Sequence, residues 1–528
     1  MAETPEGPER LGRGARVGAV ALLLAASVGL SRVLGVLRDT LLAAQVGAGA
    51  EVDAYRAAFQ IPDLLNHFLA GGALSIAFIP FYARVRTQEG RAAADSLFGV
   101  VAGTLAAAVL LATGALWWQA EALVRVQFGF DAETTALTVR LTRILLPAQV
   151  FFVTGGVIRA VLMANDRFVS QALAPLVYNA GIIVGGALAG ATHGPEGFAW
   201  GALAGAFVGP FAIPLVELAR SGLVRFQLRV APLDRRFVAY LGLALPLMLG
   251  VSLLTLDEWY ERWFGSRLGE GVVAQLGYAR MVALVPVGLI GQAIATAGLP
   301  TLSRLVSEER REALDALVTG MLRSGLALAI LAAGGLWLVA EPTVQLLFER
   351  GRFGAADTAA VVALLRILAF AVPAWVLQQI AVRPFYARGD MWRPMLLGSG
   401  VAVAAAPLYL WLGARSGATG LALAGVLGMG VSALATVGLA RRLHGAPDVA
   451  SLASSGARAA LVAAVAAAIA SLVPAPAATG LLGVSLALAI HGGVFGLLAL
   501  LGISILGDDA TRGAVQRLLV RLRLRRAP

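Results

Sequence analysis

The residues of this sequence best suited to bind a ligand are charged side chains inside long apolar segments. Arg32 lies fifteen residues into the segment that starts at residue 17, which is roughly 22 Å along a helix that rises 1.5 Å per residue. Asp39 follows Arg32 by seven residues and so shares its helical face, and Arg38 directly precedes Asp39. Because an arginine at the membrane centre costs about 2.5–3.5 kcal/mol on insertion scales, we expect these side chains to face a polar interior.

Charges in two further apolar segments extend this pattern. Asp53 and Arg56 lie three residues apart at the start of the second segment, and Arg280 lies about ten residues into the eighth. The planar fork of an arginine matches the oxygens of a phosphate group. Since the arginines outnumber the carboxylates, we interpret the group as the lining of a water-filled, cationic cavity that accepts an anionic cargo. The alternative is a set of structural pairs that neutralise one another.

Two carboxylates in the seventh apolar segment, Asp257 and Glu258, are candidates for binding a coupling ion, either Na⁺ or H⁺. The alternative is that they pair with the arginines or lie at the outer membrane interface. Motifs for enzymatic chemistry are missing, because the sequence has no HExxH, no cysteine and no lysine to complete a Walker A loop. We therefore expect no enzyme, no metal site and no cofactor, and we expect an ion gradient or the membrane potential to supply the energy.

The elements that must position these residues are membrane-spanning helices. The chain of 528 residues is 59% hydrophobic and only 14% charged, whereas a soluble domain carries roughly 25% charged residues. A helix needs about 20 apolar residues to cross the hydrocarbon core. This reading predicts an all-α integral membrane protein with about 14 transmembrane helices. The approximate spans are 17–46, 53–83, 93–118, 135–163, 169–191, 197–219, 237–264, 271–300, 313–340, 357–387, 393–413, 417–440, 456–474 and 478–506.

The distribution of arginines between the loops predicts the orientation. If the N-terminus is cytoplasmic, 26 arginines lie on the cytoplasmic side and six on the other. By the positive-inside rule, both termini are then cytoplasmic. No small-residue cleavage site precedes a soluble domain after the first apolar run, so we expect this run to be a retained helix and not a removed signal peptide. The net charge of +11 follows from topology, so we expect no nucleic-acid partner. The tail at 512–526 is basic and amphipathic, which predicts either contact with anionic phospholipids or a simple stop-transfer flank.

A weak internal repeat relates helices that are six apart in order. The segment PFYAR at 80–84 corresponds to PTLSR at 300–304, and ANDRF at 164–168 corresponds to ARGDM at 387–391. An even spacing of six gives both copies the same orientation, which predicts two six-helix bundles in a parallel repeat, plus two C-terminal helices. The predicted domains are a cytoplasmic N-terminus (1–16), an N-terminal bundle (17–220), a C-terminal bundle (237–440), helices 13 and 14 (456–506) and a basic cytoplasmic tail (507–528).

The motifs that carry these charges resemble those of a known family. They are SRVLGVLRD at 31–39, DAYRAAFQIP at 53–62, GALSIAFIP at 72–80, LPTLSR at 299–304 and FYARGD at 385–390. Together they resemble signatures of the MurJ/MviN family of lipid II flippases over about residues 17–506.

This resemblance implies a fourteen-helix member of the multidrug/oligosaccharidyl-lipid/polysaccharide exporter superfamily. Such a protein moves undecaprenyl-pyrophosphate-linked peptidoglycan precursor to the outer leaflet of the bacterial cytoplasmic membrane by alternating access. The resemblance implies cavity roles for Arg32, Arg38, Asp39 and Asp53. It also implies that helices 13 and 14 form a groove for the lipid tail.

The sequence departs from the family pattern at residues expected near the cargo. Asn66 and His67 replace a basic pair, and Gly71 replaces an acidic residue. Arg280, which precedes Met281, is displaced by one position, which is about 100° of rotation on a helix. A flippase for another polyprenyl-linked saccharide therefore remains an alternative, and a small-molecule antiporter is a more distant one. The sequence does not indicate an oligomeric state.

Overall fold

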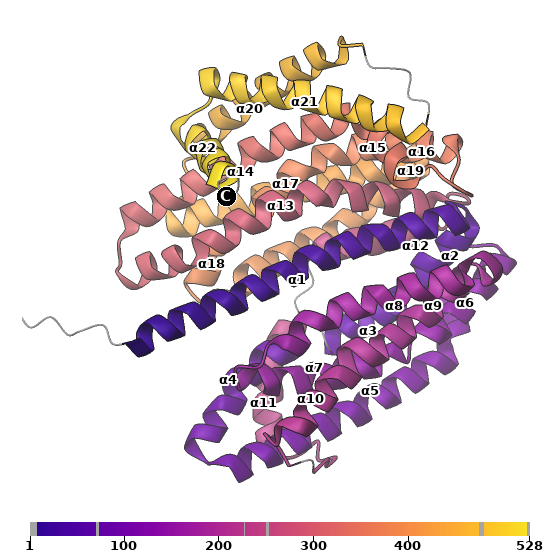
Figure 1. Cartoon of the computed structure of the whole chain (residues 1–528), viewed down its shortest axis with the longest axis vertical. Coiled ribbons are helices and arrows are strands. Elements are labelled where there is room, and N and C mark those ends of the chain that lie inside the picture. The colour runs from indigo at the N-terminus through magenta and orange to yellow at the C-terminus, as the bar shows by residue number, and fades with distance from the viewer. Residues whose placement is uncertain (1–7, 70–72, 226, 250–252, 475–479, 525–528) are drawn as a thin grey trace, which may run out of the picture. The chain divides into compact units, whose positions relative to one another are not determined.

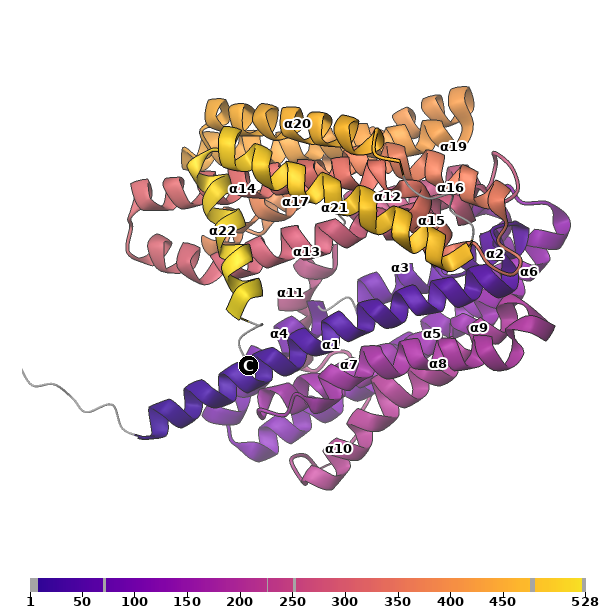
Figure 2. The same cartoon turned by 45° about the horizontal axis from the view of Figure 1, so that its top comes forward.

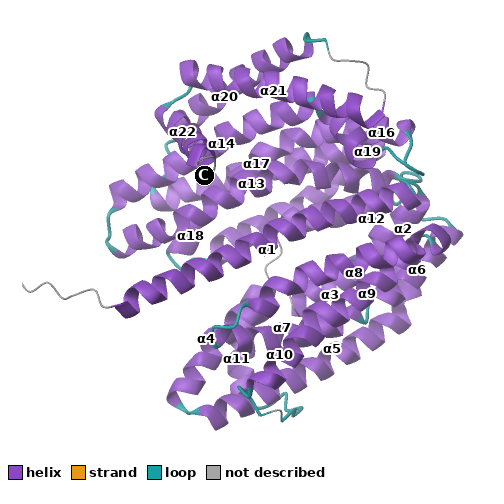
Figure 3. Ribbon diagram, viewed as in Figure 1, coloured by secondary structure: helices purple, strands orange, loops and turns teal. Residues whose placement is uncertain are grey.

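The computed structural model describes residues 8–69, 73–225, 227–249, 253–474 and 480–524 (Figure 1). Every regular element in these ranges is a helix, as the sequence predicts (Figure 3). Contacts between residues divide the chain into two compact units, Met1–Leu249 and Gly250–Pro528. We call them unit 1 and unit 2 and describe each separately.

Unit 1 is built around a core that joins α4, α5, α7 and α11. The largest buried side chains of this core include Phe78, Tyr82, Phe98 and Tyr240, and the rings of Phe78 and Tyr240 meet edge to face at 5.5 Å. The helices of unit 1 are α1 (Pro8–Val46), α2 (Ala50–Ala58), α3 (Gln60–Leu69), α4 (Ala73–Gln88), α5 (Arg91–Gln127), α6 (Ala132–Leu145), α7 (Ala148–Ala164), α8 (Val169–His193), α9 (Pro195–Ala206), the π-helix η1 (Phe207–Ala212), α10 (Ile213–Ser221) and α11 (Arg235–Leu249).

Glycines let α8 and α9 pack backbone to backbone, and the two helices lie side by side (Figure 2). A Cβ atom on Gly201 would overlap the backbone of Gly181 and Gly185, and one on Gly205 would overlap that of Tyr178. Gly201 and Gly205 form one GxxxG step, the pattern that permits close helix approach in membranes. This contact fixes α8, which also packs along α1 and carries a polar residue of the candidate site.

Unit 2 contains the longest helix of the chain as described, α19. Gly417 has φ +59° within α19 and bends it into two arms. The helices of unit 2 are α12 (Leu253–Gly265), α13 (Val272–Ser307), α14 (Arg311–Leu338), α15 (Ala340–Phe348), α16 (Ala355–Leu368), the 3₁₀-helix η2 (Ala369–Ala371), α17 (Val372–Ala381), α18 (Arg383–Ala387), α19 (Trp392–His444), α20 (Val449–Ser471), α21 (Gly480–Leu506) and α22 (Asp509–Leu524).

The helices account for the fourteen predicted spans. In the described ranges, ten helical segments are long and apolar enough to cross a membrane, and one of them, α19, covers both the eleventh and the twelfth predicted spans. The first predicted span falls on α1, and the second and seventh fall on the pairs of helices that flank 70–72 and 250–252. The seventh span is shared between the units, because α11 packs against α3, α4 and α5 of unit 1.

The last two predicted spans, α20 and α21, pack on each other and on α14 of unit 2 (Figure 1). Phe495 of α21 sits against Gly334 and Gly335 of α14. A Cβ atom on Gly335 would lie only 2.9 Å from the ring, and one on Gly334 would lie 3.0 Å from the Cβ of Ala463 on α20. The outer surface of α21 is apolar and exposed, with Leu482 at 81% and Ile505 at 71% exposure. In a membrane protein such a surface faces lipid.

Candidate functional site

The charged residues of the first predicted motif form a network between α1 and α8 in unit 1. Arg38 donates from Nε and Nη2 to the Asp39 carboxylate at 3.2 and 3.3 Å, and from Nη1 to Asn179 Oδ1 at 3.3 Å. Asn179 Nδ2 donates to Ser31 Oγ at 3.1 Å. Ser31 and Arg38 are seven residues apart and share one face of α1, so a single α8 side chain can bridge them.

The Arg38 side chain keeps 29% of its surface exposed, whereas that of Asp39 keeps 7%. The ion pair therefore neutralises Asp39 while part of the Arg38 side chain stays exposed. Arg38 thus forms the kind of pair that the alternative interpretation expects, and its role in a cargo-binding cavity stays a prediction. Asn179 was missed by the sequence analysis, because no sequence signal connects it to residues about 140 positions earlier.

The other predicted residues of unit 1 lie on α1 and α2. Arg32 is exposed, Arg56 is half-buried in the last turn of α2, and Asp53 is buried at 1% exposure. Their assignment to a cargo-binding cavity stays a prediction.

Asn66, one of the residues that depart from the family pattern, lines a small cavity inside unit 1. The cavity has a volume of about 60 Å³, and its polar lining also includes Asp63, Gln149 and Tyr178. His67 is half-buried, and Gly71 lies outside the described residues. An amide therefore stands at this cavity where the family pattern has a cation.

Unit 2 holds its predicted charges in a buried cluster. Arg280 of α13 donates from Nη2 to Asp257 Oδ2 at 2.7 Å, and from Nε and Nη2 to the two oxygens of Glu261 at 2.8 and 2.6 Å. Tyr409 of α19 donates its hydroxyl to Asp257 Oδ1. The ring of Trp375 lies 5.5 Å from the guanidinium carbon. The Arg280 side chain is only 6% exposed, and those of Asp257 and Glu261 are 0% and 3% exposed.

The cluster separates the two carboxylates that were candidates for ion coupling. Asp257 pairs with Arg280, whereas Glu258 is half-exposed and pairs with Arg262 one turn along α12. The sequence analysis missed Glu261, although its i, i+4 spacing from Asp257 places both carboxylates on one face of the helix. Arg280 has its Nε and Nη2 engaged by carboxylates, so its role as a cargo ligand stays a prediction.

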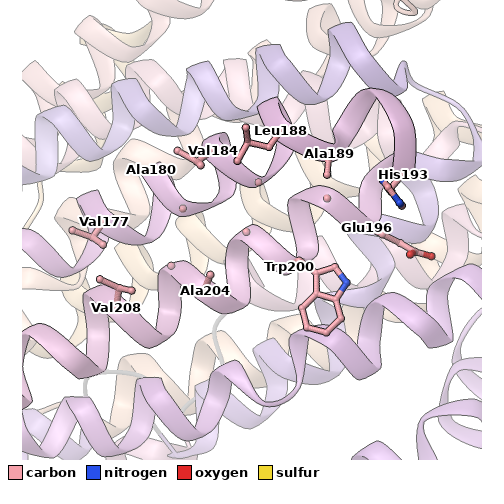
Figure 4. A pocket seen from close by; sticks show the side chains of 15 residues that line it. Val177, Ala180, Val184, Leu188, Ala189, His193, Glu196, Trp200, Ala204 and Val208 are labelled. Atoms are coloured by element: carbon pink, nitrogen blue, oxygen red, sulfur yellow. The ribbon is translucent and has the colours of Figure 1, made fainter.

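An apolar groove of about 680 Å³ runs along α8 and α9 (Figure 4). Leu188 and Trp200 line it together with small residues, and its polar end is formed by His193 and Glu196. Glu196 pairs with Arg140 of α6 at 3.1 Å. No predicted site residue lines this groove, so it is separate from the charged network of α1.

A third charged cluster anchors the start of α22. Asp508 accepts from Arg323 Nη2 of α14 at 3.0 Å, from Ser455 Oγ of α20, and from the backbone N–H of Thr511 at 2.8 Å. Burial favours the neutral acid, but hydrogen bonds from Ser455, Thr511 and Arg323 outweigh it and lower the pKa of Asp508 to about 2. The carboxylate therefore holds α14, α20 and the N-terminus of α22 together while it is ionised.

Replacing Asp508 with asparagine should loosen α22. Because the folded-state pKa is below the ordinary value of 3.8, the stabilisation by this carboxylate is complete above about pH 4–5 and is lost as the pH falls toward 2. A charge-assisted hydrogen bond contributes about 1.5–3 kcal/mol, so we expect the amides of α22 to exchange with deuterium roughly tenfold faster in Asp508→Asn at neutral pH. The exposed neighbour Asp509→Asn is the matched control. Equal exchange in the wild type and in Asp508→Asn would contradict the anchoring role.

Comparison with known proteins places this arrangement in a family. The model of the family described as lipid II flippase MurJ matches residues 42–491. The chain is 28% identical over 433 residues to the probable lipid II flippase MurJ of Bdellovibrio bacteriovorus, with 80% of this chain and 82% of the relative covered. It is 30% identical to the lipid II flippase MurJ of Burkholderia cenocepacia, with 71% of this chain and 74% of the relative covered.

Solved structures share the fold. A structure of lipid II flippase MurJ in an inward closed conformation superposes with a TM-score of 0.76 at 20% identity, covering 92% of this chain and 99% of the other. An inward-facing multidrug resistance MATE family transporter of the MOP superfamily superposes with a TM-score of 0.66 at 18% identity, covering 78% and 94%. With its long apolar helices, the chain is a multi-pass bacterial membrane protein. The extent of the match to the family model shows that it belongs to the lipid II flippase MurJ family.

Proposed function

We propose that this protein flips undecaprenyl-pyrophosphate-linked peptidoglycan precursor, lipid II, from the inner to the outer leaflet of the bacterial cytoplasmic membrane. The observation that carries the proposal is the match of residues 42–491 to the lipid II flippase MurJ family. The proposed activity is transport, because flipping moves a lipid headgroup without changing its covalent structure.

The charged residues of unit 1 supply the chemistry for the headgroup. A pyrophosphate is an anion, and a guanidinium fork binds its oxygens with charge-assisted hydrogen bonds. Arg38 is partly exposed while Asp39 and Asn179 orient it, and Arg32 and Arg56 add positive charge on α1 and α2. We assign the headgroup contacts to these three arginines. Arg280 is enclosed by two carboxylates in unit 2, and its role as a further cargo ligand stays a prediction.

The proposed mechanism is alternating access. MATE transporters of similar fold have been solved in an inward-facing and in an outward-facing conformation, which supports two states for this fold. In this mechanism the headgroup crosses through a cationic cavity while the polyprenyl tail stays in the lipid. The tail moves along the apolar outer surface of α21. The membrane potential or an ion gradient drives the cycle, and each elementary charge moved across 100 mV supplies about 2.3 kcal/mol.

The proposed topology places both termini in the cytoplasm. The support is the count of 26 arginines on that side against six on the other. The helix α22 then lies on the inner surface of the membrane, where its arginines meet anionic phospholipids. Its apolar positions Val515, Leu518, Leu519 and Leu522 follow the spacing of one helical face, which suits an interfacial helix.

A polyprenyl-linked saccharide other than lipid II is the second candidate cargo, because Asn66 and His67 replace the basic pair of the family pattern. With fewer cations, the protein could carry a polyprenyl-linked saccharide other than lipid II. The test is headgroup translocation by the purified protein in liposomes that contain either lipid II or another polyprenyl-pyrophosphate-linked sugar. We expect lipid II headgroups to become accessible outside at least tenfold faster than in protein-free liposomes. Transport of only the other lipid would overturn the assignment of lipid II.

A further inference from the structure

The buried cluster of unit 2 contains more negative than positive groups. Asp257 and Glu261 are two carboxylates, and in the described part of the chain Arg280 is the cation that contacts them. The helices packed on α12 are α13, which contributes Arg280, and α19, which contributes the neutral Tyr409. On α12 itself, Glu258 adds a further carboxylate, which is compensated by its own partner Arg262.

An unbalanced charge at this depth is strongly disfavoured. Asp257 and Glu261 are buried in a membrane protein, where water cannot stabilise an extra carboxylate charge. The simplest way to balance two carboxylates against one guanidinium is to add one proton. We propose that Asp257 holds an exchangeable proton, and that this proton is the coupling ion of the transport cycle. The second part of this statement rests on the proposed flippase function.

The hydrogen bonds place the proton on Asp257 and not on Glu261. Both oxygens of Glu261 accept from the Arg280 guanidinium, so protonation there would break a charge-assisted bond. Asp257 uses one oxygen for Arg280 and turns the other toward the Tyr409 hydroxyl. A hydroxyl can accept as well as donate, so a proton on Asp257 Oδ1 keeps both contacts.

The geometry favours a proton over a metal ion. A metal ion bound by both carboxylates would have to lie between them, and the guanidinium of Arg280 already occupies that position. Its nitrogens lie 2.6–2.8 Å from oxygens of Asp257 and Glu261. A proton needs no such space. The backbone of Gly425 on α19 also lies close to Asp257, since a Cβ there would be 3.0 Å from Oδ1. Because Asp257 is 0% exposed, exchange of the proton requires a conformational change that opens this cluster.

The proton can be detected without measuring transport. In the infrared spectrum of the purified full-length protein, a protonated carboxylic acid gives a carbonyl stretching band that a carboxylate lacks. We expect this band at neutral pH in the wild type and its loss in Asp257→Asn. The matched control is Asp95→Asn, because Asp95 is also buried but has Arg91 at 4.0 Å to balance it. A band that survives in Asp257→Asn, or that is missing from the wild type, overturns the proposal.

The coupling is tested in liposomes with the membrane potential clamped and a pH difference imposed. With one proton per headgroup, each pH unit should change the steady-state ratio of headgroups on the two sides by about tenfold. In Asp257→Asn this ratio should no longer depend on pH, although headgroups still equilibrate. A wild-type ratio that follows a sodium gradient and ignores pH overturns the coupling role. If the wild type moves no lipid II at all, the proposed function fails while the infrared result still decides the proton site.

Discussion

Cells that depend on this protein should fail to grow when Arg38 is replaced with alanine. The substitution removes a partly exposed arginine side chain from the proposed headgroup site and leaves Asp39, with 7% of its side chain exposed, without its cation. Each charge-assisted hydrogen bond lost from the pyrophosphate contributes about 1.5–3 kcal/mol, so translocation in liposomes should slow by roughly tenfold to a hundredfold. The measurement is rescue of a depletion strain, with the amount of protein in the membrane followed by immunoblot.

A double variant separates a role of Arg38 in cargo binding from its role in the ion pair with Asp39. In Arg38→Ala with Asp39→Asn, no buried carboxylate is left uncompensated, so a purely structural role predicts recovery. If Arg38 binds the cargo, the double variant stays inactive. Arg38→Lys should give intermediate activity, because it keeps the charge and loses the fork. Arg125→Ala is the control, since Arg125 is 68% exposed and pairs with Glu121. Full rescue by both Arg32→Ala and Arg38→Ala would contradict the cationic site.

The sequence predicts the fold well because the membrane imposes a simple rule on it. Each span needs a long apolar run, and such runs are visible without any tertiary information. Local breaks are harder to place. Gly417 bends α19 through a positive φ, and Pro147 separates α6 from α7 within one predicted span. Glycines and prolines occur throughout this sequence, so composition alone does not indicate which of them interrupt a helix.

The candidate site is less accessible to sequence reasoning, because its partners come from distant helices. Arg38 could be singled out by its charge in an apolar run, but Asn179 could not, since a single amide in α8 is an ordinary feature of a membrane helix. Asp257 and Glu261 could have been paired by their spacing. That Arg280 lies between them depends on how α12 packs against α13, which no local pattern determines.

Replacing Arg280 with alanine should strongly destabilise unit 2. The substitution leaves the carboxyl groups of Asp257 and Glu261 buried with no cation in contact, and breaking a buried ion pair in this way costs about 3–5 kcal/mol. We expect a clearly lower midpoint of thermal unfolding in detergent and less protein in the membrane. Arg304→Ala is the control on the same helix, since Arg304 is 68% exposed and pairs with Glu308 at 3.8 Å.

The pattern among the carboxylate variants tests the charge balance itself. Asp257→Asn and Glu261→Gln each leave one carboxylate against one guanidinium, so each single variant should be tolerated. The double variant leaves Arg280 buried without a counter-ion and should be as unstable as Arg280→Ala. Adding Arg280→Met to the double variant removes the last charge and should restore much of the stability, because a neutral cluster has no desolvation cost for ions. Equal stability of the single and double variants would mean that the surroundings, and not the two carboxylates, balance the charge of Arg280.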